Sequence, residues 1–133
     1  MKRVKILLLA ALLVALAVAT AVARERKERG ARLQFDKTCY DFGTVDRRGE
    51  NLVCEFGFEN VGNEPLVLLS VTTSCSCLKA DFSRKPVLPG ERGVVRMKLE
   101  VNKVERGVFR RVVQVRSSSI EGDNILTMQG RAQ

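Results

Sequence analysis

The chain contains no histidine and no tryptophan among its 133 residues, and it has one tyrosine. The lack of histidine excludes an imidazole general base, an imidazole metal ligand and every Ser-His or Cys-His catalytic arrangement. No other pair of nucleophile and base is apparent along the sequence. We therefore expect no catalytic residue and no bound cofactor, and a protein that is not an enzyme.

The net charge of +8 lies mainly in the first 32 residues. Residues 33–133 carry 15 Lys and Arg against 13 Asp and Glu, so this part of the chain is nearly neutral. Nucleic-acid recognition needs a basic face with interleaved aromatic residues, which this composition does not supply. We expect no nucleic-acid partner and assign the basic residues to membrane targeting, where they favour anionic headgroups.

The N-terminal segment has the pattern of an export signal. Residues 6–23 are uncharged and largely apolar, behind a basic stretch. Small-x-small patterns end at Ala21 and Ala23, which are the predicted signal cleavage sites. Eighteen apolar residues also approach the length of a bilayer span, so an uncleaved membrane anchor is the alternative. The protein is then periplasmic or secreted, or is anchored in the inner membrane with its domain outside the cytoplasm, and residues 6–23 are its only membrane contact.

The remaining sequence predicts one domain, residues 33–133, after a basic polar linker at 24–32 and a signal or anchor at 1–23. Short runs alternate apolar and polar residues, which is typical of strands in an antiparallel sheet. The clearest run places on one face Leu52, Cys54, Phe56 and Phe58. Residues 95–101 alternate in the same way, and Arg111 interrupts a third run.

Turn residues separate these runs. Residues 46–49 predict a tight turn, 60–65 a loop in which Asn60 and Gly62 tolerate left-handed conformations, and 121–124 a hairpin connection. Residues 66–71 are almost all apolar, which predicts a more central strand. About seven short strands in roughly 100 residues indicate an all-β fold, an immunoglobulin-like antiparallel β-sandwich.

Five motifs occur in a characteristic order: Asp41–Val45, Phe58–Leu66, Ser74–Cys77, Pro86–Gly93 and Gly107–Phe109. In this order they resemble the bacterial domain-of-unknown-function family 1573, whose members are similar to Hydin-type immunoglobulin-like domains of cilia and centrosome proteins. The resemblance covers about residues 35–130 and implies an exported immunoglobulin-like domain with no established activity. One departure is Ser76, where the family usually has glycine between two cysteines.

Four cysteines in an exported chain are disulfide candidates, namely Cys39, Cys54, Cys75 and Cys77, and they allow three pairings. On an extended strand the Cα atoms of Cys75 and Cys77 would lie roughly 6.5–7 Å apart, so their disulfide needs a local bend. Cys39 and Cys54 lie on strands joined by the 46–49 turn, but alternation places them on opposite faces. The sequence favours no pairing.

Other thiol chemistries compete with a structural role. The two thiolates of Cys75 and Cys77 suit Cu(I), four thiolates could hold Zn²⁺, and an exposed, acidified thiol suits redox exchange. We favour a structural role and expect no metal site.

The sequence thus predicts an exported, non-enzymatic immunoglobulin-like module that is structural or protein-binding in the cell envelope. Its partner would be an unknown envelope protein or a second copy of the chain. The candidate interaction residues are Ser74, Ser76, Pro89 and Gly90. The alternative is a thiol-based copper or redox protein that uses Cys75 and Cys77.

Overall fold

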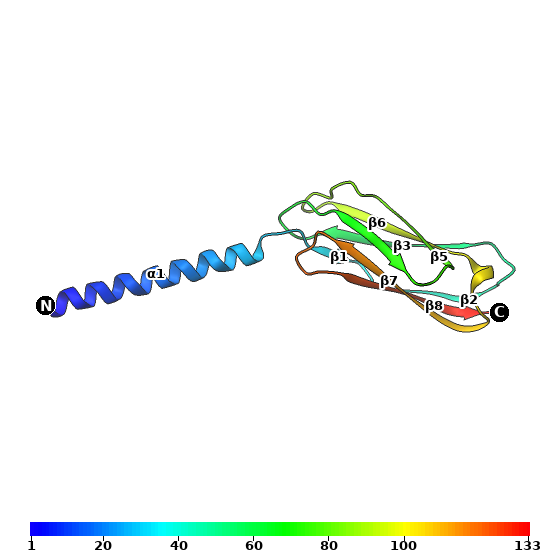
Figure 1. The fold of residues 1–133 in the computed structure, drawn as a ribbon, viewed down its shortest axis with the longest axis horizontal. Helices are drawn as coiled ribbons and strands as arrows, with labels where there is room; N and C mark the ends of the chain where they lie inside the picture. The colour runs from blue at the N-terminus through cyan, green and yellow to red at the C-terminus, as the bar shows by residue number, and fades with distance from the viewer.

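The computed structural model describes residues 1–133, apart from the side chains of residues 26–28. A helix precedes two packed sheets of four strands each (Figure 1). The first sheet has the order β1-β3-β6-β5, with bounds Leu33–Phe35, Leu52–Asn60, Arg92–Leu99 and Leu78–Phe82. The second has the order β2-β8-β7-β4, with bounds Cys39–Val45, Asn124–Ala132, Gly107–Ser117 and Leu68–Thr73. This confirms the predicted β-sandwich, with eight strands instead of about seven.

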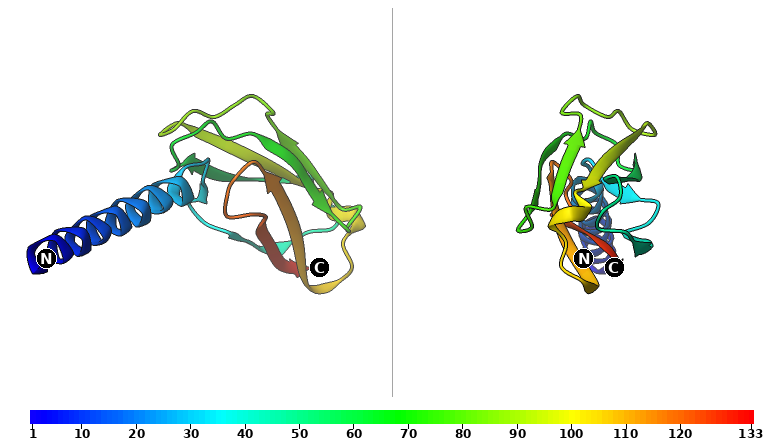
Figure 2. Two further views of the ribbon diagram at one scale, coloured as in Figure 1. Left: turned by 60° about the vertical axis from the view of Figure 1, so that its left-hand side comes forward. Right: turned by 90° about the vertical axis from the view of Figure 1, so that its right-hand side faces the viewer.

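The N-terminal helix α1 (Lys2–Glu28) points away from the sandwich (Figures 1 and 2). Within its segment Lys2–Glu25, a window of 18 residues has a mean hydropathy of 2.9 and is not buried, so the helix is long and apolar enough to cross a membrane. It is therefore compatible with a signal or an anchor, and cleavage after Ala21 or Ala23 stays a prediction. Of the expected linker at 24–32, the residues up to Glu28 are helical in the structure.

The strand pairing is antiparallel as predicted except at one position, where β2 pairs with β8 in parallel. The chain crosses from the second sheet to the first between β2 and β3, so these sequence neighbours are not neighbours in a sheet. The turn at 46–49 forms as predicted but connects the two sheets. Cys39 and Cys54 consequently lie in different sheets, which local sequence pattern could not show.

The core lies between the two sheets and follows the predicted alternation. Cys54, Phe56 and Phe58 are buried on β3, as are Val95, Met97 and Leu99 on β6. The prediction of a central strand at 66–71 was wrong, because β4 is an edge strand. The apolar residues of the 66–71 run divide between interior and solvent: Leu66 and Leu68 are buried, whereas Leu69 is 52% exposed.

The sandwich has two ends (Figure 2). The proximal end, next to α1, contains residues 30–32, 60–65 and 118–123, which hydrogen-bond to one another. The distal end contains residues 46–51, 74–77 and 100–106, including the 3₁₀ helix η1 (Val101–Lys103). The two ends are separated by the length of β3, nine residues or about 30 Å.

Candidate functional site

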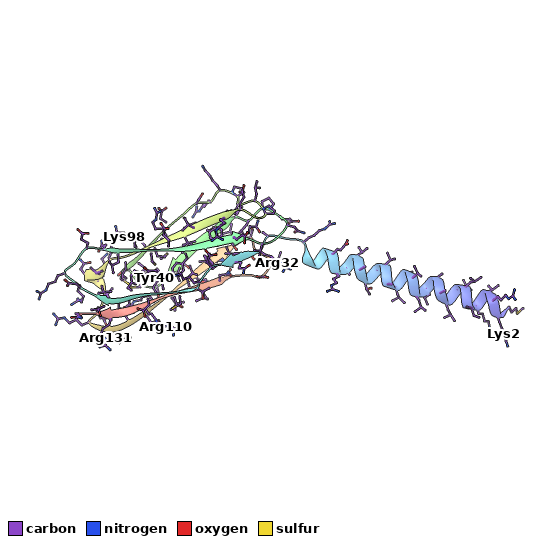
Figure 3. The ribbon with its side chains drawn as sticks, turned by 180° about the vertical axis from the view of Figure 1, so that it is seen from behind. Lys2, Arg32, Tyr40, Lys98, Arg110 and Arg131 are labelled. Carbon is purple, nitrogen blue, oxygen red and sulfur yellow. A yellow bond between two sulfur atoms is a disulfide. The ribbon has the colours of Figure 1, made fainter. Side chains whose placement is uncertain are left out.

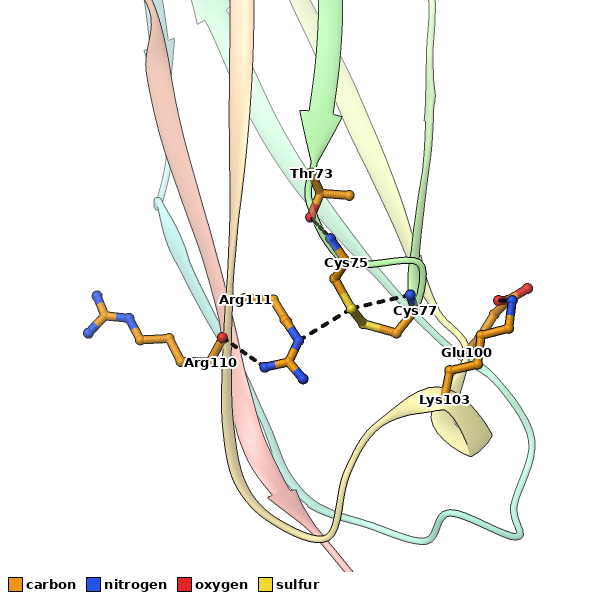
Figure 4. Close-up of a disulfide and its surroundings, with 7 residues drawn as sticks. All are labelled: Thr73, Cys75, Cys77, Glu100, Lys103, Arg110 and Arg111. Atoms are coloured by element: carbon orange, nitrogen blue, oxygen red, sulfur yellow. Dashed lines mark hydrogen bonds and ion pairs between the residues drawn. A yellow bond between two sulfur atoms is a disulfide. The ribbon is translucent and has the colours of Figure 1, made fainter.

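A disulfide joins Cys75 and Cys77 in the distal turn between β4 and β5 (Figure 4). Their Cα atoms are 5.2 Å apart, closer than on an extended strand. The bend that this pairing requires is supplied by a turn, in which the Leu78 N–H donates to the Cys75 carbonyl oxygen at 3.3 Å. The Cys75 N–H in turn donates to the Thr73 hydroxyl oxygen at 3.2 Å. The structure therefore contains the Cys75–Cys77 bond while Cys39 and Cys54 stay free, so it realises none of the three two-disulfide pairings in full.

The two bridged cysteines differ in exposure. Cys77 is completely buried against the core, whereas Cys75 is partly exposed. The Cys77 N–H donates to the Cys75 Sγ at 3.2 Å, and the Glu100 N–H donates to the Cys77 carbonyl oxygen at 2.7 Å. These bonds hold Cys77 in place and leave Cys75 as the solvent-facing member of the pair.

Arg111 contacts the disulfide from β7, the strand that pairs with β4 in the second sheet. Its Nε donates to the Cys75 Sγ at 3.3 Å, and its Nη1 donates to the Arg110 carbonyl oxygen at 3.1 Å (Figure 4). The interior face of β7 otherwise carries Phe109, Val113 and Val115. The arginine that interrupts the apolar pattern in the sequence thus points inward at the distal end, beside the turn. Sequence analysis found the interruption but not its target.

A carboxylate with two ammonium partners lies on the other side of the turn. Glu100 forms ion pairs with Lys79 at 3.4 Å and with Lys103. The hydrogen bond from the Lys103 side chain lowers the pKa of Glu100 below its usual value, and the positive charges of Lys103 and Lys79 add to this effect. Glu100 is therefore ionised and already neutralised at pH 7.

The other two cysteines are unpaired and lie apart. Cys39 is exposed on the edge strand β2, and Cys54 is buried on β3. Burial raises the pKa of the Cys54 thiol from 9.0 to about 11, so this thiol is neutral at physiological pH. Among the described residues, no group of three or more Cys, Asp or Glu side chains could hold a metal ion. The four-thiolate zinc arrangement is thus not assembled.

The candidate interaction residues do not form one surface. Ser74 and Ser76 are exposed at the distal end, whereas Pro89 and Gly90 lie at the proximal end. Gly90 has φ +82° in the predicted Pro-Gly turn, and its N–H donates to the Asn60 carbonyl oxygen at 2.8 Å. The Pro89–Gly90 turn therefore has a structural role at the proximal end.

Asn60 organises the proximal end, a role that sequence analysis missed. It is completely buried. Its side-chain oxygen accepts from the N–H groups of Arg32 and Gly62 at 3.2 and 3.0 Å. Its amide nitrogen donates to the carbonyl oxygens of Glu64 and Val87 at 2.7 and 2.9 Å. Neither Asn60 nor Gly62 adopts the left-handed conformation that these residues tolerate, since neither has a positive φ.

An open hollow of about 440 Å³ lies on the outer face of the second sheet, where β2 meets β8 and β7. Asp41 lines it, and one oxygen of its carboxylate accepts from the Gly43 N–H at 2.7 Å. This carboxylate caps backbone beside the register shift between Asp41 and Thr44 in β2. Arg110 and Arg131 also line the hollow and are exposed around it (Figure 3).

Comparison with known proteins identifies the domain type. A family model described as "Protein of unknown function (DUF1573)" matches residues 33–132. A search of curated proteins gives no significant match.

Solved structures share the fold. A protein of unknown function from Porphyromonas gingivalis W83 has a TM-score of 0.68 and 22% identity, over 79% of this chain and 48% of that one. The chain thus spans about half the length of this relative. The ASH/PapD-like domain 7 of human CEP192 has a TM-score of 0.63 and 9% identity, over 78% and 87% of the two chains. The VesB protease of Vibrio cholerae has a TM-score of 0.57 and 13% identity, over 77% of this chain and 32% of the protease. At these identities the likeness shows an immunoglobulin-like, PapD-like fold and no shared activity.

Proposed function

The chain belongs to the DUF1573 family of proteins of unknown function, and we propose that it is an exported binding module which adds a segment of an envelope protein to the free edge of β5. The proposed function is non-enzymatic, in keeping with a sequence that has no histidine. The apolar helix α1 supports export, with the sandwich in the periplasm either released or anchored. We also propose that the domain is of the Hydin type. The similarity of its fold to the PapD-like domain of CEP192 supports this.

The continuous edge of β5 carries this proposal. Both edges of the second sheet are irregular, since the register shifts between Asp41 and Thr44 on β2 and between Leu68 and Ser70 on β4. Such bulges discourage the addition of a further strand. The edge strand β1 is only three residues long. In contrast, β5 pairs with β6 without a shift over all five of its residues, and its other side has no strand partner in the described part of the chain.

The side chains of β5 leave this edge accessible. Lys79, Ala80 and Asp81 are exposed, and Ser74 and Ser76 precede the strand in the distal turn. The exposed side chains are short or charged, so main-chain hydrogen bonds would supply most of the attraction. An added strand gains its affinity from such bonds and its register from pockets for alternate side chains. A partner with an extended, flexible segment suits this edge.

Site-specific crosslinking in the native envelope tests this proposal. A photoreactive residue at Ala80, on the β5 edge, is expected to crosslink to one partner. The same residue at Val94, which is exposed on the outer face of the neighbouring strand β6, is the matched control and is expected to give no such product. Crosslinks between two copies of the chain through Ala80 would identify the partner as a second copy. Equal crosslinking from both positions, or none from Ala80, would overturn the proposal.

Proline substitution then tests the hydrogen-bonding mode. Neighbouring residues of an antiparallel edge strand present their N–H groups to opposite sides. One of Ala80→Pro and Asp81→Pro therefore removes a bond to β6 and lowers the melting temperature, whereas the other removes only a donor on the free edge. For this test the photoreactive residue is moved to position 79, which leaves positions 80 and 81 free for proline. The variant that keeps its melting temperature is expected to lose the crosslinked product. If that product is unchanged, strand addition at β5 is wrong.

A further inference from the structure

We propose that Cys75 and Cys77 form a thiol–disulfide exchange site, in which Cys75 is the sulfur that meets a partner thiol and Arg111 stabilises the Cys75 thiolate. The proposal concerns the distal turn and does not depend on strand addition at β5.

The two cysteines of the pair differ in accessibility. Cys75 is partly exposed, whereas Cys77 is completely buried and its backbone is fixed by Glu100. Exchange proceeds through a mixed disulfide on an accessible sulfur, which a second sulfur then resolves. Cys75 is placed to form the mixed disulfide, and Cys77 is placed two residues away to resolve it.

Arg111 lies beside the accessible sulfur of Cys75. It is partly buried, it points to the interior face of β7, and its Nε lies 3.3 Å from the Cys75 Sγ. Among the residues whose side chains are described, no carboxylate forms an ion pair with Arg111. A guanidinium gains little from a neutral disulfide, but it would form a charge-assisted hydrogen bond with a thiolate. Positive charge beside a cysteine is what makes a thiol reactive.

Neighbouring charges do not cancel this effect. Glu100, the carboxylate near the turn, is paired with Lys79 and Lys103. Arg111 is therefore the charged group in direct contact with the exposed sulfur (Figure 4). The same contact disfavours Cu(I) at this pair, because a guanidinium next to the sulfur opposes a second cation. The arrangement suits exchange better than metal binding.

The co-reactant in this exchange is a protein dithiol. A partner thiolate attacks the Cys75 Sγ, a new S–S bond forms, and the bond to Cys77 breaks. The electron pair leaves on the Cys77 Sγ, which takes a proton from water. The second partner thiolate then attacks the partner sulfur of the mixed disulfide and releases the Cys75 thiolate beside Arg111. The partner is oxidised to a disulfide and the Cys75–Cys77 pair is reduced by two electrons; the reverse sequence reduces a partner disulfide.

The test uses the full chain in detergent, with Cys39→Ser as the background because the exposed Cys39 thiol would also react. The protein is equilibrated with mixtures of reduced and oxidised glutathione, alkylated, and analysed by mass spectrometry. We expect Cys75 and Cys77 to be reduced reversibly while the fold persists. A disulfide that stays intact at every glutathione ratio in the folded protein would overturn the proposal.

Variants of Arg111 test its role. Arg111→Gln is expected to shift the exchange equilibrium toward the disulfide by roughly tenfold and to slow alkylation of reduced Cys75 at pH 7 by a similar factor. Arg110→Gln, the outward-facing neighbour, is the control and is expected to change neither. Arg111→Lys keeps the charge, so its exchange equilibrium and alkylation rate should lie between those of Arg111→Gln and Arg110→Gln. If Arg111→Gln does not fold, Arg111→Lys is compared with Arg110→Gln instead. If the Arg111 and Arg110 variants behave alike, Arg111 does not stabilise the thiolate.

Trapping identifies the partner-facing sulfur. In a Cys77→Ala variant, oxidised glutathione is expected to form a stable adduct on Cys75. In a Cys75→Ala variant the buried Cys77 should react at least tenfold more slowly. Equal reaction of the two variants, or faster reaction of Cys77, would overturn the assignment of Cys75.

Discussion

The backbone of Gly62 lies so close to that of Gly30 that a Cβ on residue 62 would stand 2.2 Å from the Gly30 carbonyl oxygen. The same Cβ would lie 2.6 Å from the Arg32 backbone nitrogen. Glycine is required here by close approach and not by a left-handed backbone. This contact fastens the segment that follows α1 to the proximal end of the sandwich.

Replacing Gly62 with alanine is therefore expected to lower the free energy of unfolding by about 3 kcal/mol, because backbone atoms cannot move aside as a flexible side chain can. Chemical denaturation of the two proteins measures this. Gly57→Ala is the matched control. Its Cβ would meet the carboxylate of Asp36 at 2.8 Å, the end of an exposed side chain that can rotate away. Equal losses from the two substitutions would contradict the explanation.

Removing the Asn60 amide is expected to cost stability at the same end. Asn60→Ala truncates a completely buried side chain and leaves the carbonyl oxygens of Glu64 and Val87 without their side-chain donor. We expect a loss of about 3 kcal/mol by denaturation. Asn63→Ala removes a single acceptor, for the Gly30 N–H, at an exposed residue, and should cost about 1 kcal/mol. A smaller loss at Asn60 than at Asn63 would contradict this account.

Much of the fold could be predicted from the sequence because burial in a sandwich follows a period of two. That period placed Phe56, Phe58 and Met97 in the interior correctly. It says nothing about which sheet a strand joins, so the parallel pairing of β2 with β8 was missed. It also treats the apolar run at 66–71 as buried on both faces, although β4 is an edge strand and Leu69 faces solvent.

The candidate site was less predictable, since it depends on contacts between residues far apart in sequence. The spacing of Cys75 and Cys77 implied a bend for their disulfide, but the partner choice needed the turn itself. Arg111 appeared only as an interruption of an apolar pattern. Its contact with Cys75 joins residues 36 positions apart, one on β7 and one just after the neighbouring strand β4, and no local pattern encodes that pairing.

The two unpaired thiols should differ sharply in reactivity. Iodoacetamide is expected to modify Cys39 in the folded protein and Cys54 only after unfolding, as read by peptide mass spectrometry. Fast modification of Cys54 in the folded protein would contradict its burial.

Cys54 should also give stability a dependence on alkaline pH. Its pKa is about 11 in the folded protein and 9.0 without burial, so the unfolded thiol ionises first. The stability from its neutral form is complete below pH 9 and is lost as pH rises toward 11, by on the order of 2 kcal/mol. Cys54→Ala should be less stable at pH 7 but lose less stability between pH 9 and 11. An unchanged slope between these pH values would contradict the assignment.

Glu100 should act in the opposite direction, at acid pH. Because Lys103 lowers its pKa below 4.5, the stabilisation is complete above pH 4.5 and is lost as pH falls through the folded-state pKa. An NMR titration of the Glu100 carboxyl carbon measures this directly. Lys103→Met is expected to raise the titration midpoint, and Lys79→Met should raise it less. An unmoved midpoint in the Lys103 variant would show that the ion pair is not formed in solution.

Stability should not depend on α1 but should depend on the three residues just before β1. Residues Lys2–Glu25 are not buried, so a chain that starts at Arg24, as cleavage after Ala23 would produce, should melt at the same temperature as the full chain. A chain that starts at Leu33 loses the bonds between Gly30 and Asn63, the bond from the Arg32 N–H to Asn60, and the buried Ala31. Its melting temperature should fall by on the order of 10 °C, since 1 kcal/mol corresponds to several degrees in a domain of this size. If both truncated chains have the same melting temperature, residues 30–32 connect the helix to the domain without stabilising it. If the chain starting at Leu33 alone is destabilised, these residues are part of the folded domain, and an uncleaved helix would hold the proximal end close to the membrane surface.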